Sequence, residues 1–495
     1  GGGAPGATGE AGGQAGGGDE TSGLAPTAVR GSVLGAVALI TGSTIGCGIL
    51  ALPTRTAAAG FVPSAAVLLA ASALLMCNAL LLAEVNMACL RKRRAQASVS
   101  CCALSDVVSL PEMAAEVGGS AAATAISALY LALCYALLVA FVAKAGATIG
   151  AFVPWVSPAV AGTAFAATLA VATAAGGTRG ADIINRWLTA ALLAAFAVVM
   201  FGVFGITMSD WSGLGSVAWA AAPAAAPIAM QSLVYHDLVP VIVSYLGADR
   251  RRVRLAMVLG SALPLLMMLA WEGVALGFFL GPSGMHLAAA LADPVDALTA
   301  IGGAVAVAVR SFSLLAIATS ILSTALGMYA LWLSWTSRMM SIGGAGTSMW
   351  NWLDGRASTV RKVALAAAMA LRRPWRRYGA RVFAMACVLA PPAALAACGD
   401  ISEMFMASFE FAGAYVTSLL FGCFPPAAAW VLRSRAARTG DGATGKDGDG
   451  AASTPKSERE LGGGMVVLAT LLGVALTLFG TRLARDVGAA LMGGA

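Results

Sequence analysis

Apolar runs of about 20 residues recur along the whole chain, and this feature constrains its fold more than any other. A helix of about 20 residues crosses the roughly 30 Å of hydrocarbon in a bilayer. Of the 495 residues, 59% are apolar and 11% are charged, whereas soluble domains average about 45–50% and about 25%. We therefore predict an all-α, multi-pass membrane protein. Eleven transmembrane helices are expected, at about residues 33–53, 63–90, 120–146, 158–175, 187–207, 222–246, 254–280, 304–337, 381–398, 404–432 and 463–484.

The distribution of Lys and Arg predicts the orientation of these helices. If the N-terminus is inside, 26 of the 31 basic residues fall on the inner side. The exceptions on the outer side are Arg55, Lys144, Arg310, Arg482 and Arg485. Because inner loops of membrane proteins are enriched in Lys and Arg, the alternation favours an odd number of spans that starts inside.

The remaining segments are predicted to be irregular. Residues 1–30 are rich in Gly and almost free of large apolar side chains, which is typical of a disordered tail and not of a signal or transit peptide. Because the chain begins at Gly1, we expect a fragment or a processed form. Residues 437–462 read as a disordered loop before the last helical segment, 463–495. The basic loop 338–381 has no role that the sequence predicts.

The nine cysteines and the net charge of +7 exclude several kinds of site. No two cysteines have CxxC spacing, so the sequence predicts neither a zinc site nor a disulfide framework, and no metal or cofactor is expected. The positive charge is not gathered on a soluble face, so nucleic-acid binding is not expected. The expected partners are a small solute, a coupling ion and the lipid bilayer.

The first span is interrupted by glycine in its middle. The stretch GSTIGCG contains Gly42, Gly46 and Gly48. A helix interruption leaves backbone groups without partners, which hydrocarbon tolerates only where the break lines a cavity. There the free carbonyls hold a cation or an ammonium group, and the N–H groups of the next half-helix hold a carboxylate. The alternative is close helix packing, since Gly42 and Gly46 also form a GxxxG step.

The sixth span is the counterpart of the first. Pro223, Pro227 and Pro240 flank a polar centre in the middle of an apolar run. Spans one and six each begin a block of five, which predicts an inverted repeat of residues 31–207 and 208–436. Interrupted helices at matching places in two such halves indicate a transporter site. An ordinary proline-kinked helix is the alternative.

Four stretches resemble the aromatic amino acid permease family, the tyrosine- and tryptophan-specific transport proteins of the amino acid/polyamine/organocation superfamily. They are GSTIGCGILALP, LYLALCYALLVAFVAKAG, DIINRWL and the run from PIAMQSLVYHDLVP to PLLMMLAWE. The resemblance implies a LeuT-like fold of 5+5 helices plus one, and proton-coupled symport of tyrosine or tryptophan. Val234 and Ser323 stand where the family has glycine, which leaves the size of the pocket open. The resemblance fits a plasma membrane and a plastid envelope alike.

The candidate site residues follow from the two breaks and from this resemblance. We expect carbonyls at the end of the first half-helix and N–H groups at the start of the second to bind the substrate, with polar and aromatic side chains around them: Thr41, Gly42, Ser43, Thr44, Gly46, Cys47, Gly48, Gln231, Ser232, Tyr235, and Tyr130 or Tyr135. His236, near the bilayer midplane, is the candidate proton-coupling group, although a neutral, structural imidazole is equally compatible. The superfamily resemblance implies a cation site at Ile40, Thr319 and Ser320. Arg310 and Glu272 are hypothesised to pair as an outer gate.

Three functions are compatible with the sequence. The first is a proton-coupled symporter of aromatic amino acids. The second is a transporter of the same fold that carries other neutral amino acids or uses sodium. The third is a channel or a membrane-embedded enzyme, but the sequence contains no HExxH motif and no paired midplane aspartates, so no enzyme is expected.

Overall fold

The computed structural model describes residues 31–97, 107–207, 212–281, 294–342, 382–396, 401–441 and 464–492. The predicted tail 1–30 and nearly all of the loops 338–381 and 437–462 lie outside these ranges. Every regular element in the described ranges is helical. Eight helices are long and apolar enough to cross a membrane, and a bent pair of short helices forms a ninth candidate. Two further apolar helices, Pro158–Ala172 and Val382–Ala396, are shorter.

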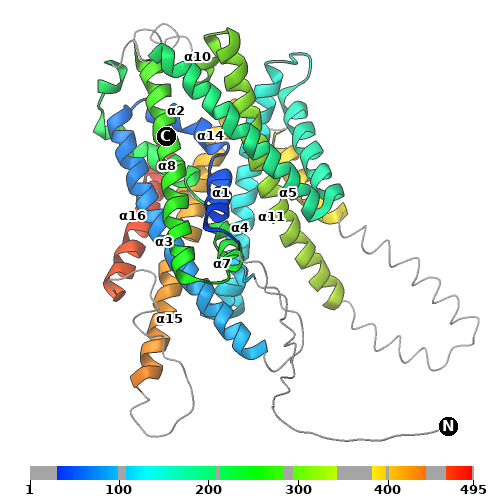
Figure 1. Cartoon of the computed structure of the whole chain (residues 1–495), viewed down its shortest axis with the longest axis vertical. Helices are drawn as coiled ribbons and strands as arrows, with labels where there is room; N and C mark the ends of the chain where they lie inside the picture. Colours follow the sequence, from blue (N-terminus) through cyan, green and yellow to red (C-terminus); the bar gives the residue numbers. More distant parts are fainter. Residues whose placement is uncertain are drawn as a thin grey trace, which may run out of the picture.

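The first span is the bent pair. It consists of α1 (Val33–Thr44) and α2 (Gly48–Thr56), which meet at an angle of 55°. Ser32 caps α1 by accepting a hydrogen bond from the N–H of Gly35 at 2.9 Å. Figure 1 shows α1 in the middle of the bundle, where it packs against α8 (Arg250–Leu280), while α2 packs against α6 (Ala226–Ser232).

The sixth span is also interrupted. It runs through η2 (Trp219–Ala225), α6, η3 (His236–Leu238) and α7 (Val239–Tyr245), and residues 233–235 between α6 and η3 are not helical. Pro227 and Pro240 lie in the first turns of α6 and α7, where a missing N–H leaves no helical hydrogen bond unmade. The prolines therefore start the helical pieces on either side of the break.

The spans around this pair begin and end close to their predicted positions. They are α3 (Phe61–Ala97), α4 (Leu110–Gly150), α8, α11 (Gly303–Ile342), the continuous run of α14 (Ile401–Phe411), η5 (Ala412–Cys423) and α15 (Phe424–Asp441), and α16 (Gly464–Met492). In α4 the backbone leaves the helical region at Gly119, with φ of 72°, just before the predicted start of the third span. The short helix α10 (Pro294–Ala300) precedes α11. In the last run, η5 is a π-helix.

Helix α5 (Pro158–Thr207) occupies the region where two spans were predicted. If straight, its 50 residues would extend over roughly 75 Å. However, its first residue lies against Gly146 at the end of α4, and Gly202 lies against Val305 at the start of α11. Arg310 of α11 lies over the ring of Phe152, two residues after the end of α4. Both ends of α5 are therefore on the same side of the molecule, so α5 turns back and has the length for both predicted spans.

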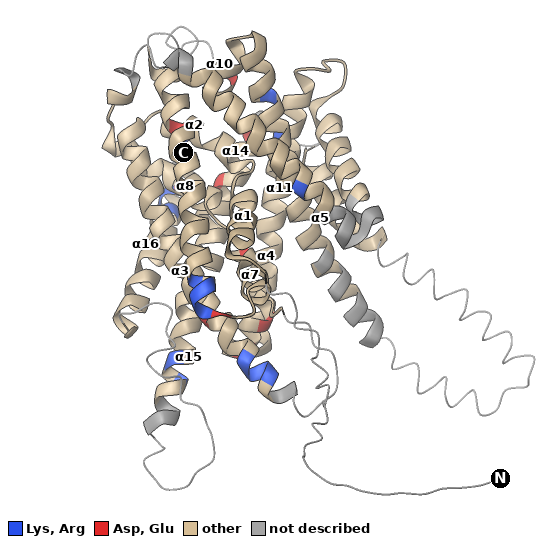
Figure 2. Cartoon of the chain, in the orientation of Figure 1, with Lys and Arg blue, Asp and Glu red and all other residues tan. Residues whose placement is uncertain are grey.

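Lys and Arg gather at one end of the bundle. Figure 2 shows them at the lower ends of α3 and α15 and at the start of α8. We call this end, marked by Arg91–Arg94 of α3, Arg250–Arg254 of α8 and Arg433 of α15, the basic end. Its ion pairs link neighbouring elements: Lys92 contacts Glu116, and Arg93 lies 3.3 Å from Glu112.

Candidate functional site

The breaks in spans one and six lie side by side. The hydroxyl of Ser232, at the end of α6, donates a hydrogen bond to the carbonyl of Gly48, at the start of α2, at 3.1 Å. A Cβ atom on Gly48 would lie 2.9 Å from the Cα of Ser232. Only glycine allows this approach, and it brings the ends of two half-helices together in the middle of the bundle.

A cavity of about 110 Å³ lies between these breaks. The first span contributes Ser43, Thr44, Gly46, Cys47 and Gly48 to its wall, and the sixth contributes Gln231, Ser232, Val234, Asp237 and Leu238. Tyr130 and Phe141 of α4, Phe409 of α14 and Phe421 of η5 add aromatic surface. The C-terminal ends of α1 and α6 and the N-terminal end of α2 meet at this wall. Helix C-termini carry partial negative charge and N-termini partial positive charge, so the cavity suits the two charged groups of an amino acid.

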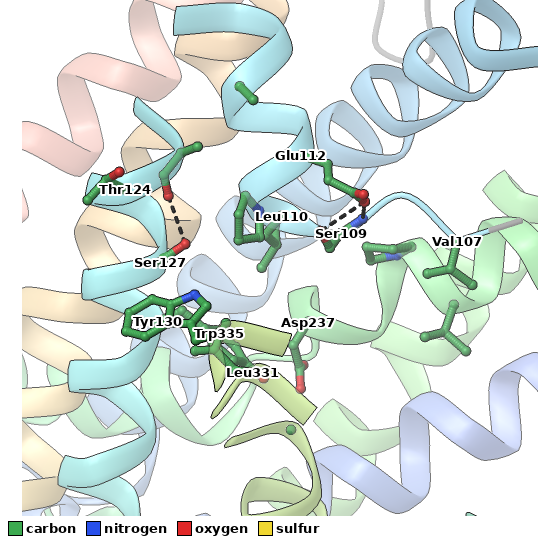
Figure 3. A pocket seen from close by; sticks show the side chains of 16 residues that line it. Val107, Ser109, Leu110, Glu112, Thr124, Ser127, Tyr130, Asp237, Leu331 and Trp335 are labelled. Carbon is green, nitrogen blue, oxygen red and sulfur yellow. Dashed lines mark hydrogen bonds between the residues drawn. The ribbon is translucent and has the colours of Figure 1, made fainter. Parts of the chain in front are cut away.

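A wider cavity of about 780 Å³ leads from this site toward the basic end. Tyr130 and Asp237 line both cavities, so the two are contiguous. Figure 3 shows Tyr130, Asp237, Leu331 and Trp335 at one side of the wider cavity and Ser109 and Glu112 at another. Because Glu112 is ion-paired with Arg93, this cavity extends to the basic end.

The predicted half-helix residues divide between the cavity and the packing around it. Ser43, Thr44, Gly46, Cys47 and Gly48 line the smaller cavity. Gly42 instead packs against Thr189 of α5, and Thr41, which is 4% exposed, is absent from the lining. The N–H of Cys47 donates to the hydroxyl of Ser320 at 2.9 Å, so α11 fixes the start of α2.

In the sixth span, Gln231 and Ser232 line the cavity but Tyr235 does not. The side-chain oxygen of Gln231 accepts a hydrogen bond from Thr417 of η5 at 2.6 Å. Its amide nitrogen is thereby left available to the cavity. The hydroxyl of Tyr235 lies 2.6 Å from that of Ser261 in α8, so this side chain packs on the opposite side of the span.

Of the two tyrosines predicted to face the site from the third span, Tyr130 lines the cavity and Tyr135 does not. The hydroxyl of Tyr135 donates to the carbonyl of Cys387, on the helix Val382–Ala396, at 2.7 Å. Five residues correspond to about 140° of rotation around an α-helix, so the two tyrosines cannot face the same cavity.

His236 lies outside both cavities. Its ring is fully buried and stacks on Phe421, with 4.9 Å between ring centroids. Neither ring nitrogen makes a hydrogen bond of normal geometry to a described residue, although the backbone of Leu75 is nearby. Asp237, the next residue, lines both cavities but is not among the site residues predicted from the sequence. The signal was present, since an acidic residue in the middle of a span is unusual.

The three predicted cation ligands already have partners in the protein. The carbonyl of Ile40 accepts hydrogen bonds from the hydroxyls of Ser43 and Thr44, at 2.9 and 2.7 Å. Thr319 donates to the carbonyl of Ala316 at 3.0 Å, and Ser320 accepts from Cys47. Hydroxyls that bond to their own backbone in this way are common in membrane helices.

The hypothesised pair of Arg310 and Glu272 is wrong. Glu272 is buried and accepts a hydrogen bond from Thr56 of α2 at 2.7 Å, whereas Arg310 lies over Phe152. At the end opposite the basic end, Arg55 of α2 instead pairs with Glu410 of α14 at 2.5 Å.

Comparison with solved structures identifies the fold. The structure of MhsT in complex with L-phenylalanine matches with a TM-score of 0.55 and 14% identity, over 90% of this chain and 98% of that one. An Eremococcus coleocola manganese transporter matches with a TM-score of 0.51 and 14% identity, over 92% and 88% of the two chains. At this identity the likeness shows the fold alone: an all-helical membrane protein of the LeuT-like class.

Comparison of sequences identifies the family. Tyrosine-specific transport system 1 of Haemophilus influenzae is 28% identical over 305 residues, which cover 60% of this chain and 71% of the relative. Tyrosine-specific transport system 2 of the same organism is 29% identical over 314 residues, or 61% and 73% of the two chains. These relatives are transport systems and not enzymes, as the sequence predicts. The profile of the tryptophan/tyrosine permease family matches residues 29–445. The chain is therefore an integral, multi-pass membrane protein that belongs to the tryptophan/tyrosine permease family.

Proposed function

We propose that this protein is a secondary active transporter that carries tyrosine, and also tryptophan, across a membrane together with a proton. The observation that carries the proposal is the meeting of two interrupted helices around a cavity, held by the hydrogen bond from Ser232 to Gly48. Interrupted helices that meet near the bilayer midplane are the binding sites of transporters with inverted repeats. The tyrosine-specific relatives support an aromatic amino acid as the substrate.

The aromatic wall of the cavity supports this substrate class. Tyr130, Phe141, Phe409 and Phe421 surround the space where a substrate side chain would lie. Aromatic rings attract one another in offset and edge-to-face arrangements by about 0.5–1.5 kcal/mol beyond the burial of their area. The amide of Gln231, fixed by Thr417, adds a donor that suits a phenolic oxygen.

We propose the topology that the charge pattern favours. The basic end is then the inner side, the N-terminus is inside, and eleven spans comprise repeats 31–207 and 208–436 and a final helix in 463–495. The smaller cavity is then the binding site, and the wider cavity opens it to the inner side. We propose a proton as the coupling ion, because the resemblance to the permease family implies proton-coupled symport.

Uptake by the purified protein in liposomes tests the proposal. We expect labelled tyrosine to accumulate when an inward proton gradient is imposed, with no response to a sodium gradient. Unlabelled tyrosine, tryptophan and phenylalanine are expected to compete, whereas leucine and alanine do not. Uptake that requires sodium, or that leucine inhibits as strongly as tyrosine, would instead support a transporter of other neutral amino acids or a sodium symporter. A current that flows without substrate would indicate a channel.

A further inference from the structure

Asp237 occupies the junction of the two cavities. It lies in η3, directly after the break in the sixth span, and it lines both the 110 Å³ cavity and the 780 Å³ cavity. Figure 3 shows Asp237 on the same side of the wider cavity as Leu331 and Trp335. Its side chain is exposed even though its position in the sequence is in the middle of a span. No other Asp, Glu, Lys or Arg among the described residues lines the smaller cavity.

A carboxylate at this position changes the charge of the loaded site. An amino acid brings one positive and one negative group, so a zwitterion bound beside an ionised Asp237 leaves a net negative charge. Charge in a site surrounded by hydrocarbon costs free energy unless it is compensated. One proton on Asp237 makes the loaded site neutral, and this links each substrate to one proton.

We propose that Asp237 is the side chain that binds and releases the coupling proton. The inference rests on the proposed function above and assigns its proton to a residue. On the outer side the carboxylate takes up a proton and becomes a carboxylic acid. In the conformation seen here, the acid returns the proton to the water of the wider cavity, and the carboxylate is restored.

The surroundings of Asp237 fit this role. Tyr130 and Cys134 of α4 are the titratable groups that face it from the neighbouring helix. Glu112 lines the wider cavity but not the smaller one, near the basic end. No cation pairs with Asp237 among the described residues, so its charge is free to be neutralised by a proton.

The other titratable groups within the described spans are placed less favourably. His236 is fully buried against Phe421 and lines neither cavity. Glu272 is buried and bonded to Thr56, away from both cavities. Glu84 is ion-paired with Arg433, and Glu410 with Arg55. A coupling group must exchange protons with water on each side in turn, and of these carboxylates Asp237 alone reaches the cavity that leads to the basic end.

The experiment compares two transport modes in liposomes that contain the full chain. Counterflow of labelled tyrosine against unlabelled tyrosine needs no proton gradient, whereas net accumulation does. A gradient of about one pH unit supports at most roughly tenfold accumulation per coupled proton. Asp237→Asn keeps the shape of the protonated acid but cannot release a proton. We expect it to retain counterflow and to lose both net accumulation and tyrosine-dependent proton uptake, measured with a pH-sensitive dye.

Three further variants test whether the effect is specific to the carboxyl group of Asp237. Asp237→Glu is expected to keep gradient-driven accumulation with a shifted pH profile, which shows that a carboxyl group and not the fold is required. Glu112→Gln and His236→Gln are expected to accumulate tyrosine as the wild type does. Accumulation by Asp237→Asn, or loss of its counterflow while Asp237→Glu is active, overturns the assignment. If the wild-type protein transports tyrosine without moving protons, the proposed proton coupling itself fails, whatever the variants do.

Discussion

At the residue scale, the site depends on how closely two backbones approach. Gly48 and Ser232 are in contact, and their hydrogen bond connects α2 to α6. Gly46 is similarly close to Ser320, since a Cβ atom on Gly46 would lie 2.3 Å from that hydroxyl oxygen. The glycines of the first span therefore allow spans six and eight to pack closely against it, in addition to allowing the break in the helix.

This contact predicts that Gly48→Ala impairs transport. The new Cβ atom would lie 2.9 Å from the backbone Cα of Ser232, and a backbone atom cannot move aside as the end of a side chain can. Overpacking of this kind costs about 1–3 kcal/mol, and strain of this size in the conformation that binds tyrosine corresponds to a roughly 5- to 150-fold loss of tyrosine uptake. Uptake is measured at equal amounts of membrane-inserted protein.

The matched control for this variant is Gly473→Ala in α16. A Cβ atom on Gly473 has nothing within 4 Å, so uptake by this variant is expected to equal that of the wild type. Normal uptake by Gly48→Ala would show that the two breaks move apart during transport without cost and would remove the contact from the mechanism.

The positions of the breaks could be predicted from the sequence, but the directions of the side chains next to them could not. The glycines and prolines in the sequence identified both interruptions, and seven of the ten substrate-site residues proposed in spans one and six line the cavity. His236 and Asp237 are adjacent, yet one is sealed against Phe421 and the other lines both cavities. The non-helical residues 233–235 interrupt the helical period just before η3, so spacing along the sequence cannot assign these two residues to faces.

At the element scale, the helices hold the site in place through a few polar contacts within an apolar bundle. Thr417 of the π-helix η5 orients Gln231, and Ser320 of α11 holds the start of α2. π-helical segments are rare and often occur at functional sites. The bundle thus contributes polar groups to the site from spans that lie far apart in the sequence.

The pairing of Glu84 with Arg433 shows the same limit of sequence reasoning. Glu84 lies two turns from the basic cluster that ends α3, and this spacing on its own indicates a side chain that extends toward the membrane surface. In the structure, the Nε and Nη2 atoms of Arg433 in α15 donate to its two carboxylate oxygens at 2.8 and 2.7 Å. Helix boundaries follow from hydropathy, because each helix satisfies its own backbone in the membrane. Which charged residues pair between distant helices depends on how the helices pack. The local sequence around each residue does not show this.

This ion pair predicts a loss of stability in Arg433→Met. The side chains of Arg433 and Glu84 are only 6% and 15% exposed, so the variant leaves a buried carboxylate without its main partner. Removing one member of a buried pair typically costs about 3–5 kcal/mol, whereas replacing both by apolar groups costs far less. We expect a lower midpoint temperature of unfolding in detergent for Arg433→Met and recovery of most of the loss in Arg433→Met with Glu84→Leu.

Lys92→Met provides the comparison for an exposed pair. Lys92 and its partner Glu116 are 54% and 31% exposed, and pairs of this kind contribute about 0–1 kcal/mol. Its midpoint temperature is expected to stay near that of the wild type. A double variant at Glu84 and Arg433 that is no more stable than Arg433→Met would show that the pair is not what stabilises the contact between α3 and α15.

At the scale of the whole molecule, the site communicates with one end of the bundle. The wider cavity leads from Asp237 to Glu112 at the basic end. At the opposite end, the Arg55–Glu410 pair and the hydrogen bond from Thr56 to Glu272 join α2 to α14 and α8. A transporter must expose its site to each side in turn, and this arrangement is the one expected when the site faces the basic end.

Labelling of single cysteines from each side of the membrane tests both the orientation and this opening. Thr124 is exposed and lines the wider cavity near the start of the membrane part of α4, and Trp155 is 81% exposed just beyond the other end of that helix. In a variant without the nine native cysteines that still transports tyrosine, Thr124→Cys is expected to react with an impermeant maleimide only from the inner side, because the cavity connects it to the water at the basic end. Trp155→Cys is expected to react only from the outer side. Reaction of both cysteines from the same side would contradict a membrane crossing by α4, and exchange of the two sides would show that the basic end faces outward.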